Sequence, residues 1–267
     1  MKFKKYWVIL KLEWQKFLEY RGDILVYTVS GSIIPFVALG IWLAVISSGG
    51  KTIFSQSELI IYFLLAIWVN IFISAWSAYF IGEDIKNGDF SNYLLKPFSL
   101  LEHNLANNIG EKSFKLVIAS IFVVIVGYIL LGNMALEANI SVMSFILFLV
   151  SLLFAAIIYF FIDMCIGLAT FWIHDNEFLR YFNNILRDFF SGRIIPIAFL
   201  PGIFYTTALI LPFRYILSFP IEVLLNKLDT LSLVSGFSIQ MFWLLIFSFL
   251  YNLLYKQGIK TYQAFGS

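Results

Sequence analysis

The chain of 267 residues is 61% hydrophobic and only 13% charged, with 30 Phe and 7 Trp, whereas soluble domains carry about 25% charged residues. This composition excludes a water-soluble globular protein and predicts an all-α protein that crosses the membrane several times. The formal net charge of +2 is too small to indicate a nucleic-acid partner. We expect a single transmembrane domain over residues 1–267.

Residues 1–22 carry large apolar side chains at intervals of four and three, with lysines on the opposite arc. This spacing places the apolar side chains on one face of a helix, which predicts an amphipathic helix lying on the membrane surface. Packing of that face on a partner protein is the alternative. The residues of the apolar face are Phe3, Trp7, Leu10, Trp14 and Phe17.

Five uncharged stretches are long enough to cross the hydrocarbon core, which takes about 20 residues in a helix. They are residues 24–50, 59–82, 116–136, 138–162 and 230–255.

We expect a sixth crossing between residues 163 and 229. It is either a polar span over 176–192 followed by short hydrophobic helices, or a surface helix followed by a span over 194–213. With the N-terminus in the cytoplasm, only Lys51, Arg214 and Lys227 of the 18 Lys and Arg residues face outward. The positive-inside rule therefore favours two cytoplasmic termini.

Residue patterns typical of enzymes or metal sites do not occur in the sequence. His103 and His174 are far apart and lack the spacing of zinc ligands. We therefore expect no catalytic residue and no metal. Asp163 is flanked by apolar residues and is expected inside the bilayer. It is a proton-coupling group, the end of a span, or an ion-pair partner of Arg180 or Arg187.

Residues 83–115 are the longest predicted cytoplasmic segment, which is too short to fold by itself. A short apolar stretch lies in it between a glycine and a proline. We expect a connector that follows the membrane surface or a short helix that contacts a cytoplasmic partner. The apolar residues are Phe90, Tyr93, Leu94 and Leu95.

Two stretches resemble the type 2 ABC exporter permeases. GEDIKNGDFSNYLLKPFSLLEHNLA, over residues 82–106, is similar to the segment that holds the coupling helix of this family. SGRIIPIAFLPGIFYTTALILPFRYILSFP, over residues 191–220, is similar to the family's fifth span and the re-entrant helices that follow it. The residues to which the resemblance gives a role in ATPase coupling are Glu83, Gly88, Tyr93, Leu94, Leu95, Lys96 and Pro97.

The resemblance implies six spans, an N-terminal surface helix, a cytoplasmic coupling helix and re-entrant helices over 194–220. It also implies an export permease in the cell membrane, surrounded by lipid, which works as a homodimer or heterodimer. Each chain would dock on a separate ATPase subunit, and that subunit would bind the ATP and Mg. The permease itself would bind no cofactor.

A fifth span over 176–192 would be too polar to face lipid, so we expect it to face a cavity between two permease chains. Prolines remove backbone donors and break long helices, which predicts short pieces over 194–217 that form a gate near the external face. A kinked ordinary span is the alternative. The expected pathway and gate residues are Asn183, Asn184, Arg187, Asp188, Gly192, Pro196, Pro201 and Pro212.

Two other classes of function stay open from the sequence. An ion-coupled secondary transporter would need internal repeats or broken helices around a coupling ion, and the sequence contains only one predicted broken region. A sensor or assembly subunit of the same architecture would signal or anchor without moving a substrate.

Overall fold

A computed structural model describes residues 7–8, 11, 14–15, 21–50, 53–95, 98–132 and 140–262. Within these residues all regular structure is helical and no strand occurs. Five helical stretches are long and apolar enough to span a membrane, which confirms the all-α class and the five apolar spans. These stretches are Val29–Ser47, Gln56–Lys86, Leu100–Leu131, Val142–Phe171 and Thr230–Thr261.

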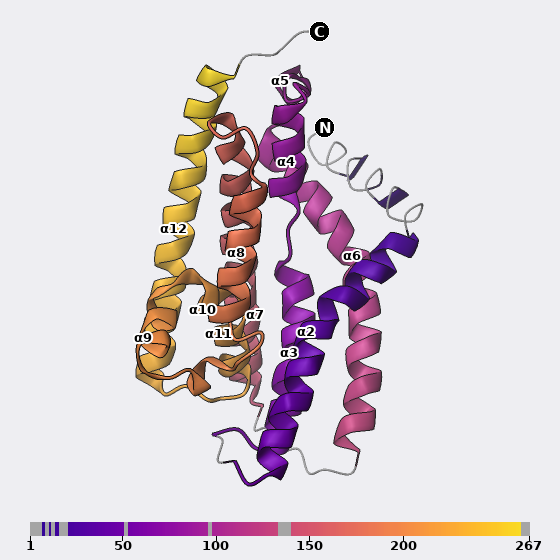
Figure 1. Cartoon of the computed structure of the whole chain (residues 1–267), viewed down its shortest axis with the longest axis vertical. Helices are drawn as coiled ribbons and strands as arrows, with labels where there is room; N and C mark the ends of the chain where they lie inside the picture. Colours follow the sequence, from indigo (N-terminus) through magenta and orange to yellow (C-terminus); the bar gives the residue numbers. More distant parts are fainter. Residues whose placement is uncertain are drawn as a thin grey trace.

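Helix α7 (Val142–Leu168) lies in the middle of the bundle (Figure 1). It contacts α3 (Gln56–Ile73), α4 (Ser77–Lys86) and α12 (Thr230–Thr261). Helices α2 (Arg21–Ser47) and α6 (Leu100–Leu131) pack on α3 at one side. A helix that is apolar on all faces is suited to this central position.

The third span begins at Leu100 rather than near residue 116. A capping box starts α6, because Ser99 Oγ accepts from the Glu102 N–H at 3.2 Å and Glu102 Oε2 accepts from the Ser99 N–H at 2.8 Å. The prediction of a connector over 83–115 was therefore too long, since only residues 87–99 separate α4 from α6. Charged residues between 102 and 115 lie within the helix instead.

The second span is interrupted, which the sequence did not predict. Helix α3 ends at Ile73 and α4 begins at Ser77, and side chains from other helices bind the backbone groups that the break exposes. Asp163 Oδ2 accepts from the Ala78 N–H at 2.8 Å, and Asn108 Nδ2 donates to the Ser74 carbonyl at 3.0 Å. Broken backbone at membrane depth requires such internal partners.

Several short helices connect α7 to α12, and residues 194–213 do not form one helix. This excludes the continuous or merely kinked span over 194–213, because Pro201 and Pro212 each precede or begin a new helix. The elements are η1 (Ala169–Phe171), α8 (Glu177–Phe190), η2 (Ile197–Phe199), α9 (Gly202–Ile210), α10 (Pro212–Ile216) and α11 (Ser218–Leu224).

Helix α8 is too short to cross the membrane alone. Its 14 residues extend about 21 Å, whereas the hydrocarbon core is about 30 Å thick. Helices α9, α10 and α11 gather in the half of the molecule away from the C-terminus (Figure 1). A sixth crossing made of α8 and these short pieces stays a prediction.

The predicted surface helix lies mostly beyond the described part of the chain. Phe3, Leu10 and Phe17 are outside the described residues, whereas Trp7 and Trp14 are helical. The Trp14 ring lies 5.2 Å from the Phe114 ring of α6. The surface position of this helix therefore stays a prediction.

Candidate functional site

A five-residue helix, α5 (Ser91–Leu95), lies between α4 and α6 at the same end of the molecule as the C-terminus (Figure 1). The chain enters α5 through Gly88, whose φ of 83° favours glycine. Phe90 is fully buried, and its N–H donates to the Asp84 carbonyl at 2.9 Å. The Tyr93 hydroxyl donates to the Asp84 carboxylate at 2.7 Å. These bonds fix α5 to the last turn of α4.

Tyr262, the residue that follows α12, also binds the segment that contains α5. The Tyr262 hydroxyl donates to the Gly88 carbonyl at 2.6 Å and accepts from the Ser91 N–H at 3.3 Å. Its ring centroid lies 5.4 Å from that of Phe90 and 5.9 Å from that of Phe171. Helix α5 is thus attached both to α4 and to the C-terminal end of α12.

The four apolar residues predicted for this segment differ in exposure. Phe90 and Tyr93 point inward, whereas Leu94 and Leu95 are 49% and 85% exposed. Of the other predicted coupling residues, Glu83 lies in α4, and Lys96 and Pro97 lie outside the described residues. The anchored helix therefore presents two neighbouring leucines at its surface.

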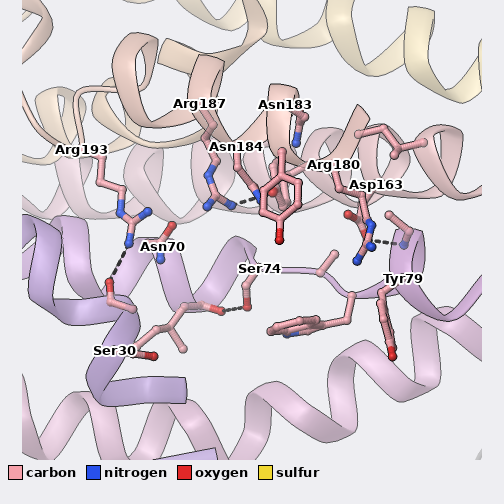
Figure 2. A pocket seen from close by; sticks show the side chains of 18 of the residues that line it. Ser30, Asn70, Ser74, Tyr79, Asp163, Arg180, Asn183, Asn184, Arg187 and Arg193 are labelled. Carbon is pink, nitrogen blue, oxygen red and sulfur yellow. Dashed lines mark hydrogen bonds between the residues drawn. The ribbon is translucent and has the colours of Figure 1, made fainter. Parts of the chain in front are cut away.

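A second candidate site is a polar cavity of about 470 Å³ between the α2–α3–α4 side and the α7–α8 side. Three predicted pathway residues, Asn183, Asn184 and Arg187, line it. Figure 2 shows Arg180, Arg187 and Arg193 reaching into the space from one side, with Ser74 and Tyr79 on the other. The polar face of α8 thus opens on a cavity within one chain. The predicted cavity between two permease chains stays a prediction.

Two of the arginines are held by protein partners. Arg187 Nη1 donates to the Tyr159 hydroxyl at 2.6 Å. Arg193 Nη1 donates to Asp188 Oδ1 at 2.6 Å, and Arg193 Nη2 donates to the Gly31 carbonyl of α2 at 2.7 Å. Asp188, a predicted pathway residue, therefore acts as the partner of Arg193, and the pair joins the end of α8 to α2.

Asp163 lies in α7 and lines the cavity. Its carboxylate accepts from the backbone of α4, as described above, and no ion pair joins it to Arg180 or Arg187 within the part of the chain that the structure describes. Capping of the break in the second span was not among the roles considered from the sequence, and it explains why this carboxylate lies inside the bundle.

The predicted gate residues lie apart from the polar cavity. Gly192 has a φ of 87°, and its carbonyl accepts from the Tyr62 hydroxyl at 2.9 Å. Pro196 and Pro201 precede η2 and α9. Pro212 lines a separate apolar cavity of about 310 Å³ between α7, α8, α10 and α12. None of these four gate residues lines the polar cavity. Asn183 lines both cavities and is therefore the one predicted pathway residue that shares a space with Pro212.

Several cavity residues were not assigned a role from the sequence. Asn70 and Ser74 are isolated polar residues in an apolar span, and their spacing of four places them on one helix face. That spacing was the available signal. The other residues without a predicted pathway role include Ser30, Gly31, Tyr79, Lys115, Arg180 and Arg193.

A partly exposed ion pair joins the end of α4 to the segment that precedes α8. Lys86 Nζ lies 3.1 Å from Asp175 Oδ2, and the Glu177 N–H donates to Asp175 Oδ1 at 2.8 Å. The Glu177 amide and the Lys86 ammonium lower the pKa of Asp175 below its ordinary value. Among the described residues, no cluster of His, Cys, Asp and Glu has the arrangement of a metal site.

Comparison with protein families identifies the chain. The model of the ABC-2 family transporter protein matches residues 54–266, which include α5, α8 and the short helices after it. No curated protein gave a match. Because the family model covers most of the chain, this protein belongs to the ABC-2 transporter family and is a multi-pass membrane protein of the permease type.

Proposed function

We propose that the chain is the permease subunit of an ATP-driven exporter, and that a separate ATPase subunit docks on α5. Family membership supports the permease role. The observation that supports the docking site is the exposed pair Leu94 and Leu95 on a helix anchored to two other helices. The permease binds no nucleotide, and its ATPase partner binds ATP and Mg.

Movement of the ATPase reaches the membrane through the anchors of α5. A displacement of Leu94 and Leu95 passes through Tyr93 and Asp84 to α4, and through Tyr262 to α12. Helix α4 moves separately from α3 because the chain is not helical between Ile73 and Ser77. The break lies beside the polar cavity, so this movement changes the shape of the cavity.

Two permease chains form the transport pathway. Helix α8 and the short helices after it make the sixth crossing, with Asn183, Asn184 and Arg187 facing the pathway. The region from Gly192 to Pro212 forms the gate near the external face. The polarity of α8 supports this arrangement, because arginine and asparagine side chains are costly to expose to lipid.

Both termini and α5 lie on the cytoplasmic side. The 32 residues of α6 extend about 48 Å, which takes the chain from α5 to the opposite face before residue 140. A Leu95→Cys variant should react with a membrane-impermeant maleimide only after permeabilisation, whereas Ile140→Cys should react in intact cells. The reverse pattern would refute this orientation.

The docking role is tested by replacing Leu94 and Leu95 with Asp. Burying one leucine stabilises by about 1.5–3 kcal/mol, so loss of both should weaken binding of the ATPase at least about a hundredfold. Co-purification of the ATPase and its substrate-stimulated hydrolysis measure the effect. Ile140→Asp is a matched control, because Ile140 and Leu94 are both 49% exposed. Normal co-purification and stimulation in the double variant would refute the proposal.

A further inference from the structure

The charged side chains of the polar cavity do not balance. Four basic residues and one acidic residue line it, namely Lys115, Arg180, Arg187, Arg193 and Asp163. Lys115 has an ion-pair partner in Glu111, and Arg193 has one in Asp188. The Asp163 carboxylate accepts from the backbone of α4. The cavity therefore keeps an excess of positive charge on α8.

Arg180 carries most of this excess. Its guanidinium group lies 5.1 Å from the centroid of the Tyr79 ring, and among the described residues it makes no ion pair and no side-chain hydrogen bond. Its Nε is buried and lacks a hydrogen-bond partner within the same part of the chain. An unsatisfied buried donor is costly, so the Arg180 Nε–H requires an acceptor that no described residue supplies.

Arg187 lies on the same face of α8, two turns further along. The separation of seven positions corresponds to about 10 Å along the helix axis. Among the described residues, only one terminal nitrogen of Arg187 has a close acceptor, which is the Tyr159 hydroxyl. The carboxylate of Asp188 lies 3.8 Å from the Arg187 Nε. Asn183 and Asn184 lie between the two arginines in the cavity wall (Figure 2). The wall thus places guanidinium and amide donors along the cavity.

We propose that this cavity binds an anionic group, phosphate or carboxylate, of the substrate that the permease moves. The proposal rests on the proposed function and adds the chemical class of the substrate. Guanidinium groups bind phosphate and carboxylate through two parallel hydrogen bonds, and such bonds are stronger than those between neutral groups. Arg180 supplies this fork, and Arg187 and the asparagines supply further donors.

Binding of anions by the full chain tests the proposal without the ATPase. The chain is placed in phosphatidylcholine nanodiscs and titrated with inorganic phosphate, which represents a soluble anion. Retention of phosphatidylglycerol, measured by native mass spectrometry in mixed nanodiscs, represents an anionic group carried by a lipid. The variants are Arg180→Gln, Arg187→Gln and their combination, with Arg180→Lys to retain the charge and exposed Lys256→Gln as the charge-matched control.

We expect one of the two probes to bind the unaltered chain at least about tenfold more tightly than the double glutamine variant. Lys256→Gln should bind like the unaltered chain, and Arg180→Lys should lose less affinity than Arg180→Gln. Equal binding of both probes by the unaltered chain and the double variant would overturn the proposal. Normal anion binding by Arg180→Gln, together with loss of cross-linking between two permease chains in that variant, would also overturn the proposal. That result would assign Arg180 to the interface between the two chains.

These outcomes are separate from the test of the proposed function. The anion assay contains no ATPase, and the Leu94 and Leu95 variants leave the cavity unchanged. Failure of anion binding with normal ATPase coupling would remove the substrate class alone.

Discussion

Replacing Tyr262 with Phe removes one hydroxyl group from the anchor of α5 and leaves the aromatic ring in place. The hydroxyl donates to the Gly88 carbonyl and accepts from the Ser91 N–H. Each such bond contributes about 0.5–1.5 kcal/mol. Loss of both should make detachment of residues 88–95 from α12 easier by about 1–3 kcal/mol, because the ring still packs on Phe90.

Hydrogen exchange measures this change directly, since local opening limits exchange at protected amides. The amides of residues 88–95 should exchange about 5-fold to 150-fold faster in Tyr262→Phe, whereas those of α7 should be unchanged. Tyr255→Phe is the control, because no hydrogen bond of the Tyr255 hydroxyl occurs among the described residues. Unchanged exchange at 88–95, or equal acceleration in the control, would show that Tyr262 does not anchor α5.

Two carboxylates provide further predictions. Asp163→Ala should lower the free energy of unfolding by about 0.5–2 kcal/mol, as loss of a helix cap does. Asp163→Asn keeps an acceptor for the Ala78 N–H and should lose less stability. Equal losses of the two variants in thermal unfolding would contradict the capping role. The lowered pKa of Asp175 means that its contribution to stability is complete above the ordinary pKa of 3.8 and is lost as the pH falls through the lower value in the folded protein. Stability measured against pH should therefore fall less steeply at the acidic end in Asp175→Asn, and an unchanged profile would show that the contacts with Lys86 and the Glu177 N–H add nothing.

The polar face of α8 could be predicted because the information lies within one short segment. Arg180, Asn183 and Arg187 recur at helical spacing in a chain with few charges, and the cost of exposing them to lipid requires a cavity. The apolar spans are equally local, because length and hydropathy suffice to place them.

The features that the sequence did not predict depend on distant partners. The break at residues 74–76 contains no proline or glycine, and its backbone groups are satisfied by Asp163 and Asn108, far along the chain. The inward turn of Phe90 and Tyr93 likewise depends on Asp84 and on Tyr262. Residue spacing within α5 alone does not show which of its apolar side chains pack against another helix.

Cross-linking from residue 95 tests most directly whether a separate ATPase drives this permease. The Leu95→Cys variant is made with Cys165→Ala, which removes the buried free cysteine, and membranes are treated with a short bismaleimide and photolabelled with azido-ATP. Docking on α5 predicts one cross-linked product that carries the nucleotide label, and none from Ile140→Cys at the opposite face. Substrate transport by the chain in liposomes without ATP, with no labelled product from residue 95, would contradict it.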